Sequence, residues 1–388
     1  MSDGSGMVGG CRESGEGAGM TAWQEIKLGD IGQVVTGKTP SKDNPEDWGE
    51  DVLFITPSDY KNYGKKAYSS IRMLSQVGAA RQGKRLLPQS SVLVTCIGSD
   101  MGKTVVNDLP CVTNQQINAI IPNRSVVDGD FLYYLTRDLY ETLTTLGGDG
   151  TAVPILNKSD FENIEVTIPR PPEQKAIAAV LSSLDDKIDL LHRQNQTLEA
   201  MAANLFRQWF VEEAQEDWKE VPMGHLFEIS SGKGIKKEQL ADDGLFPVLG
   251  ANGEIGRTND YLFDERLIFT GRVGTVGNIF IVDGKKVWLS DNTLVFRKMR
   301  WFYFVYFSLK VARLADYNAG STQPLIRQSD IKEIPVNTPS EAILDKFEIF
   351  SNEVFQKIEA NDKQIQTLEK LRDNLLPKLM SGEVRVSA

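Results

Sequence analysis

The hydrophobic residues of this chain follow two patterns, and each pattern occurs twice. Short apolar runs bounded by turn residues predict β-strands. Examples are Val52–Thr56, Ser91–Thr95, Leu267–Thr270 and Asn278–Val282. One helix-like segment follows the strands in each half, at residues 130–146 and 301–314. The first pattern therefore predicts two mixed α/β domains of the α+β class, each with an irregular sheet.

The second pattern is a heptad repeat that follows each predicted domain. Pro171 and Pro172 fit the first turn of a helix, after which apolar residues recur at alternating spacings of three and four. Each helix should run for about 30 to 35 residues, roughly 50 Å. A pseudo-two-fold relation between the halves predicts that the two helices pack as an antiparallel coiled coil. The predicted seam residues are Ile177, Leu184, Ile188, Leu191, Leu198 and Leu205 in the first helix, and Val354, Ile358, Ile365, Leu368 and Leu375 in the second.

Two asparagines interrupt this seam. Asn195 and Asn361 occupy heptad positions that are otherwise apolar. A polar seam residue can set the register of a helix pair, or it can be a tolerated defect. The pattern leaves both readings open.

An internal repeat relates the two halves residue by residue. Segment 23–38 aligns with 218–233 at an offset of 195, so that Trp23 and Gly37 match Trp218 and Gly232. Segment 150–205 aligns with 320–375 at an offset of 170, without a gap. Chance does not preserve such a register, so we infer a duplication.

The fall in offset places about 25 fewer residues inside the second domain than inside the first. Conserved ends and a changed middle fit domains whose ends serve assembly and whose middles serve specificity. Tolerant loops are the alternative interpretation. The chain then divides as follows: 1–22, a disordered extension; 23–171, first domain; 172–213, first long helix; 214–338, second domain; 339–381, second long helix; 382–388, a tail.

Charge argues against an unassisted nucleic-acid binder. The net charge of the 388 residues is −10, whereas phosphate neutralisation needs local Lys and Arg. The cations are unevenly spread, however. Segment 58–85 holds seven Lys and Arg residues against Asp59 alone, and a second cluster lies at 285–300. Such clusters are commonly solvated faces, so they permit a DNA ligand without requiring one.

Cysteine usage and hydropathy predict a cytoplasmic protein. Cys11, Cys96 and Cys111 form neither a disulfide framework nor a metal-spaced cluster, and the last two lie in strand-like runs, where a buried thiol is expected. Residues 1–20 lack the apolar core of a secretory signal. The strongest apolar run, Trp301–Leu309, is too short to span a bilayer.

Catalytic and metal-site motifs are not apparent. The run Gly98–Thr104 resembles a phosphate-binding loop but has one residue too few between its glycines, and Val105-Val106 continues as a strand. His192 and His225 belong to no visible triad or metal site. No methyl-donor loop or nuclease cluster accompanies them, so we expect no catalytic residue and no metal in this chain.

Several segments together resemble one known family. They are the Trp23–Ile31 start, the turn Gly37–Ser41, the run Thr113–Ile120, and Gly150–Leu156 with Ile168–Gln174. In this order, and repeated, they resemble the specificity (S) subunit of type I restriction–modification systems, from Trp23 to about Met380. The second copy departs at Gly232–Ile235 and Ser290–Thr293, which makes its contact residues harder to assign.

The resemblance implies a division of labour. Each domain would be a target-recognition domain that reads one half of a bipartite duplex DNA site. The helices would set the spacing and dock two methyltransferase (M) subunits, through which restriction (R) subunits join. S-adenosylmethionine, ATP and Mg would belong to those partners, leaving this chain without a cofactor. M subunits could also share the phosphate contacts, which answers the objection from charge.

Polar side chains on the variable loops are the predicted DNA contacts. They are Lys38, Thr39, Ser58, Tyr60, Lys61, Lys65 and Lys66 in the first domain, and Lys233, Asn252, Arg257, Arg272, Asn292 and Arg297 in the second. The main alternative function is a non-catalytic coiled-coil scaffold whose domains bind protein or glycan. If the chain did not bind duplex DNA, the scaffold function would be favoured.

Overall fold

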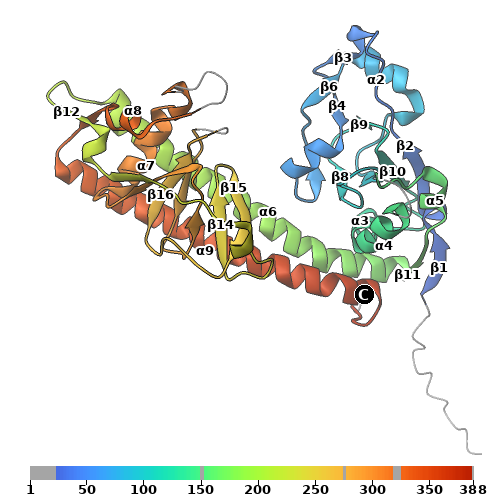
Figure 1. Cartoon of the computed structure of the whole chain (residues 1–388). Coiled ribbons are helices and arrows are strands. Elements are labelled where there is room, and N and C mark those ends of the chain that lie inside the picture. The colour runs from blue at the N-terminus through green and yellow to red at the C-terminus, as the bar shows by residue number, and fades with distance from the viewer. Residues whose placement is uncertain (1–22, 149–152, 274–276, 318–324, 387–388) are drawn as a thin grey trace, which may run out of the picture. The chain divides into compact units, whose positions relative to one another are not determined.

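The computed structural model describes residues 23–148, 153–273, 277–317 and 325–386 (Figure 1). The predicted extension 1–22 with Cys11, and Gly150 and Gly274, lie outside these residues. Two compact units make up the chain: residues 1–190 with 365–388, and residues 191–364. No helix of the described residues is long and apolar enough to cross a membrane.

The first unit is built around a five-stranded sheet of order β2-β10-β7-β8-β5. Its strands are β2 (Gly32–Thr36), β5 (Lys66–Ala67), β7 (Val92–Thr95), β8 (Thr104–Asn107) and β10 (Ile117–Pro122). A second sheet, of order β3-β6-β4-β9, contains β3 (Trp48–Gly49), β4 (Val52–Ile55), β6 (Arg72–Leu74) and β9 (Cys111–Thr113). Strands β1 (Gln24–Lys27) and β11 (Glu165–Ile168) form an antiparallel pair.

Alternation within the central strands builds a core on each face of the first sheet. Val92 and Val94 pack under helix α3 (Gly129–Asp138), whereas Leu93 packs against the second sheet. The two long helices join the same core, with Ile177 from α6 (Pro171–Arg207) and Leu379 from α9 (Glu341–Met380). The remaining helices of this unit are α1 (Leu28–Ile31), α2 (Gln76–Gln82), α4 (Tyr140–Gly148) and α5 (Lys158–Glu162).

Over its described residues, the second unit repeats this plan with fewer strands. Its sheets have orders β13-β19-β16-β17, β15-β14-β18 and β12-β20. The strands are β12 (Lys219–Pro222), β13 (Glu228–Ser231), β14 (Phe246–Gly250), β15 (Gly253–Thr258), β16 (Leu267–Gly271), β17 (Ile279–Val282), β18 (Trp288–Leu289), β19 (Thr293–Arg297) and β20 (Pro335–Thr338). Helices α7 (Phe302–Val311) and α8 (Gln328–Lys332) take the places of α3 and α5. The prediction of two mixed α/β domains with long helices is confirmed.

The long helices run antiparallel within each unit. In the first unit Asp185 of α6 pairs with Arg372 of α9, and Glu173 at the start of α6 pairs with Arg385, which follows the end of α9. In the second, the ring of Phe206 packs on that of Phe347, and Asn195 bonds to residues 361 and 362. All eleven predicted seam residues are buried or half-buried.

The seam asparagines bond to each other. Asn361 Nδ2 donates to Asn195 Oδ1 at 2.8 Å, and Asn195 Nδ2 donates to Asp362 Oδ1 at 2.8 Å. Because Asn361 is only 1% exposed, its amide group needs this partner. A pair that forms only at one alignment of the helices favours the register-setting interpretation.

Candidate nucleic-acid interface

The segments of the first domain that the sequence analysis singled out come together in one cluster of turns. The turn after β2 is fixed by two backbone bonds: Gly37 N–H donates to Ile117 O at 3.2 Å, and Lys38 N–H to Thr113 O at 2.9 Å. A Cβ at Gly37 would lie 2.3 Å from Asn114 O. The backbones approach so closely that only glycine fits this position.

The end of β7 adds two more segments to the cluster. Cys96 N–H donates to Gln116 O at 2.7 Å, and Cys96 O accepts from Leu156 N–H at 2.8 Å. Residues 37–39, 96–98, 113–117 and 155–156 therefore lie together; we call them the first turn cluster. The phosphate-loop-like run Gly98–Thr104 leads directly into strand β8, so it lacks the helix N-terminus that such a loop needs.

The second domain repeats these hydrogen bonds one for one. Gly232 N–H donates to Thr293 O at 3.1 Å and Lys233 N–H to Leu289 O at 2.8 Å. Arg272 takes the place of Cys96: its N–H donates to Asn292 O at 2.7 Å, and its carbonyl accepts from Ile326 N–H at 3.0 Å. Residues 232–233, 271–273, 289–293 and 325–326 form the second turn cluster.

Matching these bonds locates the length difference between the domains. Ile55 O accepts a hydrogen bond from Asn114 N–H, and Leu249 O accepts the equivalent bond from Ser290 N–H. Leu249 therefore corresponds to Ile55 at an offset of 194. The β-bridge Leu87–Cys111 corresponds to Phe263–Val287, an offset of 176. Most of the shortening therefore falls within residues 56–86, the variable segment, which corresponds to only 250–262 in the second domain. The basic stretch found in the sequence lies in this segment.

The predicted contacts of the first domain fall into two groups. Lys38, Ser58, Lys61 and Lys66 are exposed, and Lys66 forms an exposed ion pair with Asp108 at 3.6 Å. Half-buried Thr39 donates from Oγ1 to Gln115 at 2.9 Å.

Two other first-domain predictions need correction, because both side chains are used inside the domain. Tyr60 is 6% exposed and its hydroxyl donates to Leu93 O at 3.1 Å, so it belongs to the core between the sheets. Lys65 has a side chain only 10% exposed, and it pairs with Asp130 at 2.7 Å. Neither is available to a ligand in this structure.

The second domain divides in the same way. Lys233, Asn252 and Asn292 are exposed. Arg257 and Arg297 are half-buried and engaged: Arg257 donates to the carbonyls of residues 244 and 245, and Arg297 pairs with Glu265 at 3.0 Å. These two guanidinium groups hold loops in place within the domain, and their role as DNA contacts stays a prediction.

Arg272 keeps unused donor capacity. It is half-buried, and its guanidinium contacts Ser231 Oγ at 3.5 Å. Its buried Nε has no hydrogen-bond partner among the described residues.

Residues that the contact prediction omitted also reach these surfaces. Gln115 is exposed beside Thr39 and Lys38, and Lys84 and Arg85 are exposed at the end of the variable segment. Gln115 lies in the Thr113–Ile120 run already noted, so a motif signal for it existed. Among the described residues, no group of three or more His, Cys, Asp or Glu side chains could hold a metal ion.

Both cysteines of the described residues are buried, as predicted. Burial raises the pKa of Cys96 and that of Cys111 to about 12. Thiols with so high a pKa are poor nucleophiles at neutral pH.

Comparison with known proteins covers nearly the whole chain. The family model described as "Type I restriction modification DNA specificity domain" matches residues 20–200 and again 215–370. The chain is 30% identical to the type I restriction enzyme MjaIX specificity subunit of Methanocaldococcus jannaschii, with 94% of each chain covered. It is 39% identical to the HindI specificity subunit of Haemophilus influenzae over 38% of this chain and 32% of the relative.

A solved structure shares the fold. The S subunit of a type I restriction–modification system from M. genitalium superposes with a TM-score of 0.56 at 19% identity, covering 92% of this chain and 96% of the other. The two matches of the family model fall on the two halves of the internal repeat.

Proposed function

The chain belongs to the type I restriction modification DNA specificity family, and from that membership we propose that each of its domains reads one half of a bipartite duplex DNA site. The observation that carries this proposal is the repetition of the turn cluster. Five backbone hydrogen bonds of the first domain have direct counterparts in the second. Two surfaces of the same design in one chain suit a target of two separate parts.

The side chains available for this task differ between the clusters. Lys38, Gln115 and Lys61 are exposed in the first domain, and Lys233 and Asn292 in the second. Lysine ammonium groups suit phosphates, whereas Gln and Asn amides can form paired hydrogen bonds with base edges, best with adenine. Differences in the variable segment and at Arg272 would then let the two domains read different sequences.

Catalysis in this proposal lies with partner subunits. Two M subunits would dock on α6 and α9 and supply S-adenosylmethionine chemistry, and R subunits would supply ATP- and Mg-dependent cleavage. The net charge of −10 supports shared binding, since M subunits can provide phosphate contacts that this chain lacks. We place the complex in the cytoplasm with its DNA.

Methylation mapping tests the proposal directly. Cells that carry this subunit and its M partner should modify a split motif with a fixed gap. Replacing residues 218–339 with the segment of another family member should change one half of the motif only. Changes on both sides of the gap would contradict the model of two independent readers.

Binding measurements test the named residues. We expect Lys38→Gln and Lys233→Gln each to weaken salt-sensitive binding of the subunit–M complex to its duplex. Lys219→Gln is the matched control, because Lys219 is exposed on strand β12 outside the turn clusters. If all three substitutions changed the DNA affinity equally, the turn clusters would not form the interface. If the complex had no affinity for duplex DNA, the scaffold function would be favoured.

A further inference from the structure

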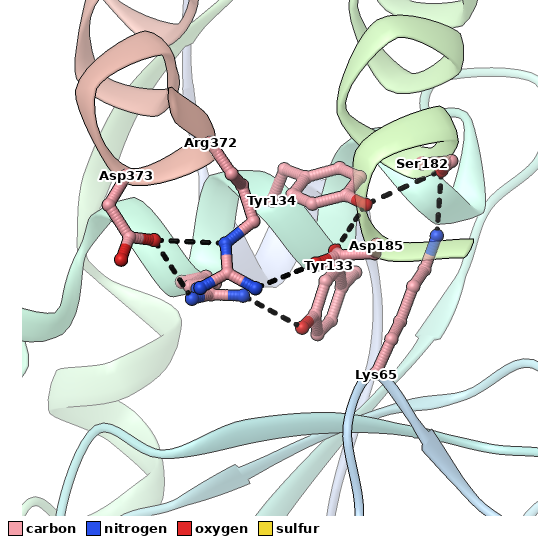
Figure 2. Close-up of polar contacts among 8 residues, drawn as sticks. Lys65, Tyr133, Tyr134, Ser182, Asp185, Arg372 and Asp373 are labelled. Carbon is pink, nitrogen blue, oxygen red and sulfur yellow. Dashed lines mark hydrogen bonds and ion pairs between the residues drawn. The ribbon is translucent and has the colours of Figure 1, made fainter. Parts of the chain in front are cut away.

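A buried polar network joins the first domain to both long helices (Figure 2). The Tyr134 hydroxyl of α3 donates to Asp185 Oδ2 of α6 at 2.6 Å. Arg372 of α9 donates from its guanidinium to the other carboxylate oxygen, Asp185 Oδ1, at 2.8 Å. The side chains of Arg372 and Asp185 are only 11% and 8% exposed. One carboxylate thus connects three helices.

Additional contacts extend the network on both sides. Arg372 Nε donates to Asp373 Oδ1 at 2.9 Å, and the same oxygen accepts from Arg137 of α3 at 3.2 Å. Lys65, from the variable segment, donates to Ser182 of α6 at 2.8 Å. Its ammonium also lies 4.9 Å from the centre of the Tyr134 ring. The variable segment is therefore fastened to the same patch of α6.

Protonation favours the observed pattern of donors. Burial, followed by the nearby Asp185 carboxylate, raises the pKa of Tyr134 far above its usual value. Burial opposes the charge of Arg372, but its hydrogen bonds to Asp373 and Asp185 outweigh that effect and raise its pKa. The phenol and the guanidinium thus remain donors at any physiological pH.

The second domain is attached to the helices by a different kind of contact. At the offset of 170, the counterparts of Asp185 and Arg372 are Phe355 and Ala202. The Tyr303 ring of α7 stacks on Phe355 with centroids 4.6 Å apart. The ion pair between Lys310 of α7 and Glu199 of α6 is more exposed than that between Arg372 and Asp185, with side chains 37% and 44% exposed.

This contrast gives the network a distinct role. A buried ion pair commonly adds little stability relative to apolar packing of similar volume, and the second domain shows that apolar packing serves at the equivalent positions. Hydrogen bonds, unlike apolar contacts, depend strongly on angle and distance. Replacing packing by such bonds therefore restricts orientation more than it adds stability.

We propose that Tyr134, Asp185 and Arg372 form an orientation lock, which holds the first domain at one angle on α6 and α9 and thereby sets the gap that the complex accepts between its half-sites. This inference rests on the proposed reading of a bipartite site. The three residues are positioning residues: none of them needs to touch DNA.

Gap tolerance of the intact complex tests the lock. Once the motif of the wild-type complex is mapped, duplexes with the native gap and with gaps one base pair shorter or longer are compared in methyl transfer. Tyr134→Phe removes one hydroxyl and keeps the ring. We expect the preference for the native gap to fall by about tenfold, as for loss of one charged hydrogen bond, while activity on the native gap changes by less than about threefold.

Two further variants make the result specific. Tyr306→Phe is the matched control: its hydroxyl bonds Glu199 at 3.3 Å on the equivalent helix α7, and it should leave the gap preference unchanged. Asp185→Asn keeps an acceptor for Tyr134 and should give an intermediate preference.

The possible failures are distinguishable. If Tyr134→Phe lowers the unfolding free energy but keeps the wild-type gap preference, the network is structural only and the lock is refuted. If the wild-type complex modifies an undivided motif, the proposed function fails first.

Discussion

The carboxyl group of Glu348 should make the second domain less stable as the pH rises. Glu348 lies on α9 and accepts a hydrogen bond from Phe304 N–H at 2.8 Å, in the first turn of α7. The N-cap residue of α7, Trp301, forms no side-chain hydrogen bond that would cap the helix. Burial raises the pKa of Glu348 to about 7 from an ordinary value of 4.5, although the backbone N–H groups of α7 and Arg266 partly oppose the shift.

The sign and size of the effect follow from this difference. The folded state binds the proton more tightly than the unfolded state, so its advantage is complete below pH 4.5 and is lost as the pH rises to about 7. At about 1.4 kcal/mol per pKa unit, and discounted for partial exposure, the loss should be about 2 to 3 kcal/mol. In Glu348→Gln an uncharged amide can accept the same bond, so the variant should gain on the wild type between pH 5 and pH 8.

Hydrogen exchange of α7 amides, with urea unfolding at each pH, measures this difference locally. The control is Glu359→Gln on the same helix, because an exposed ion pair with Lys363 lowers the pKa of Glu359. Because this contribution is complete above pH 4.5 and is lost only as the pH falls further, the difference between wild type and Glu359→Gln should stay constant from pH 5 to pH 8. A constant difference between wild type and Glu348→Gln from pH 5 to pH 8 would mean that Glu348 stays ionised, and the argument would fail.

Three further changes test the core and the turns. Gly37→Ala should destabilise the first domain by about 2 to 4 kcal/mol in urea unfolding, because its Cβ would meet Asn114 O at 2.3 Å; Gly129→Ala, where nothing lies within 4 Å, should change stability little. Tyr60→Phe removes the buried hydroxyl that donates to Leu93 O and should lower the unfolding free energy by about 1 to 2 kcal/mol. The DNA affinity of the folded protein should not change. A loss of affinity without a loss of stability would make Tyr60 a DNA contact after all. Cys96 and Cys111 should resist alkylation at pH 8 in the native protein and react after denaturation, as mass spectrometry can show, since burial raises the pKa of each to about 12.

The sequence predicted the repeated plan because periodicity and self-similarity are local or regularly spaced signals. Heptads located α6 and α9, and short apolar runs located the central strands. The segment predicted as one helix at 130–146 is instead α3 followed by α4 (Tyr140–Gly148). The regular helix is interrupted at Leu139, where φ is −76° and ψ is 5°, and apolar residues on both sides of the break concealed it.

The use of each charged side chain could not be predicted in the same way. Lys65 looked like one cation among several in a basic stretch, yet its hydrogen-bond partner Ser182 is 117 residues away. Asp185 falls between apolar seam positions, yet it is buried with two partners that are distant in sequence, Arg372 at 187 residues and Tyr134 at 51 residues. Such pairings depend on tertiary contacts, and no local spacing encodes them.

The two ends of the variable segment pair with neighbouring residues of one short stretch of chain in each domain. In the first, Ile55 pairs with Thr113 and Leu87 with Cys111, so both ends lie on β9. In the second, Leu249 pairs with Leu289 in β18, and Phe263 pairs with the preceding Val287. With both anchors fixed, residues can be gained or lost between them at a modest entropic cost. A lineage of such proteins could thus acquire new targets by insertion and deletion at this place, while the strands outside the segment keep their register.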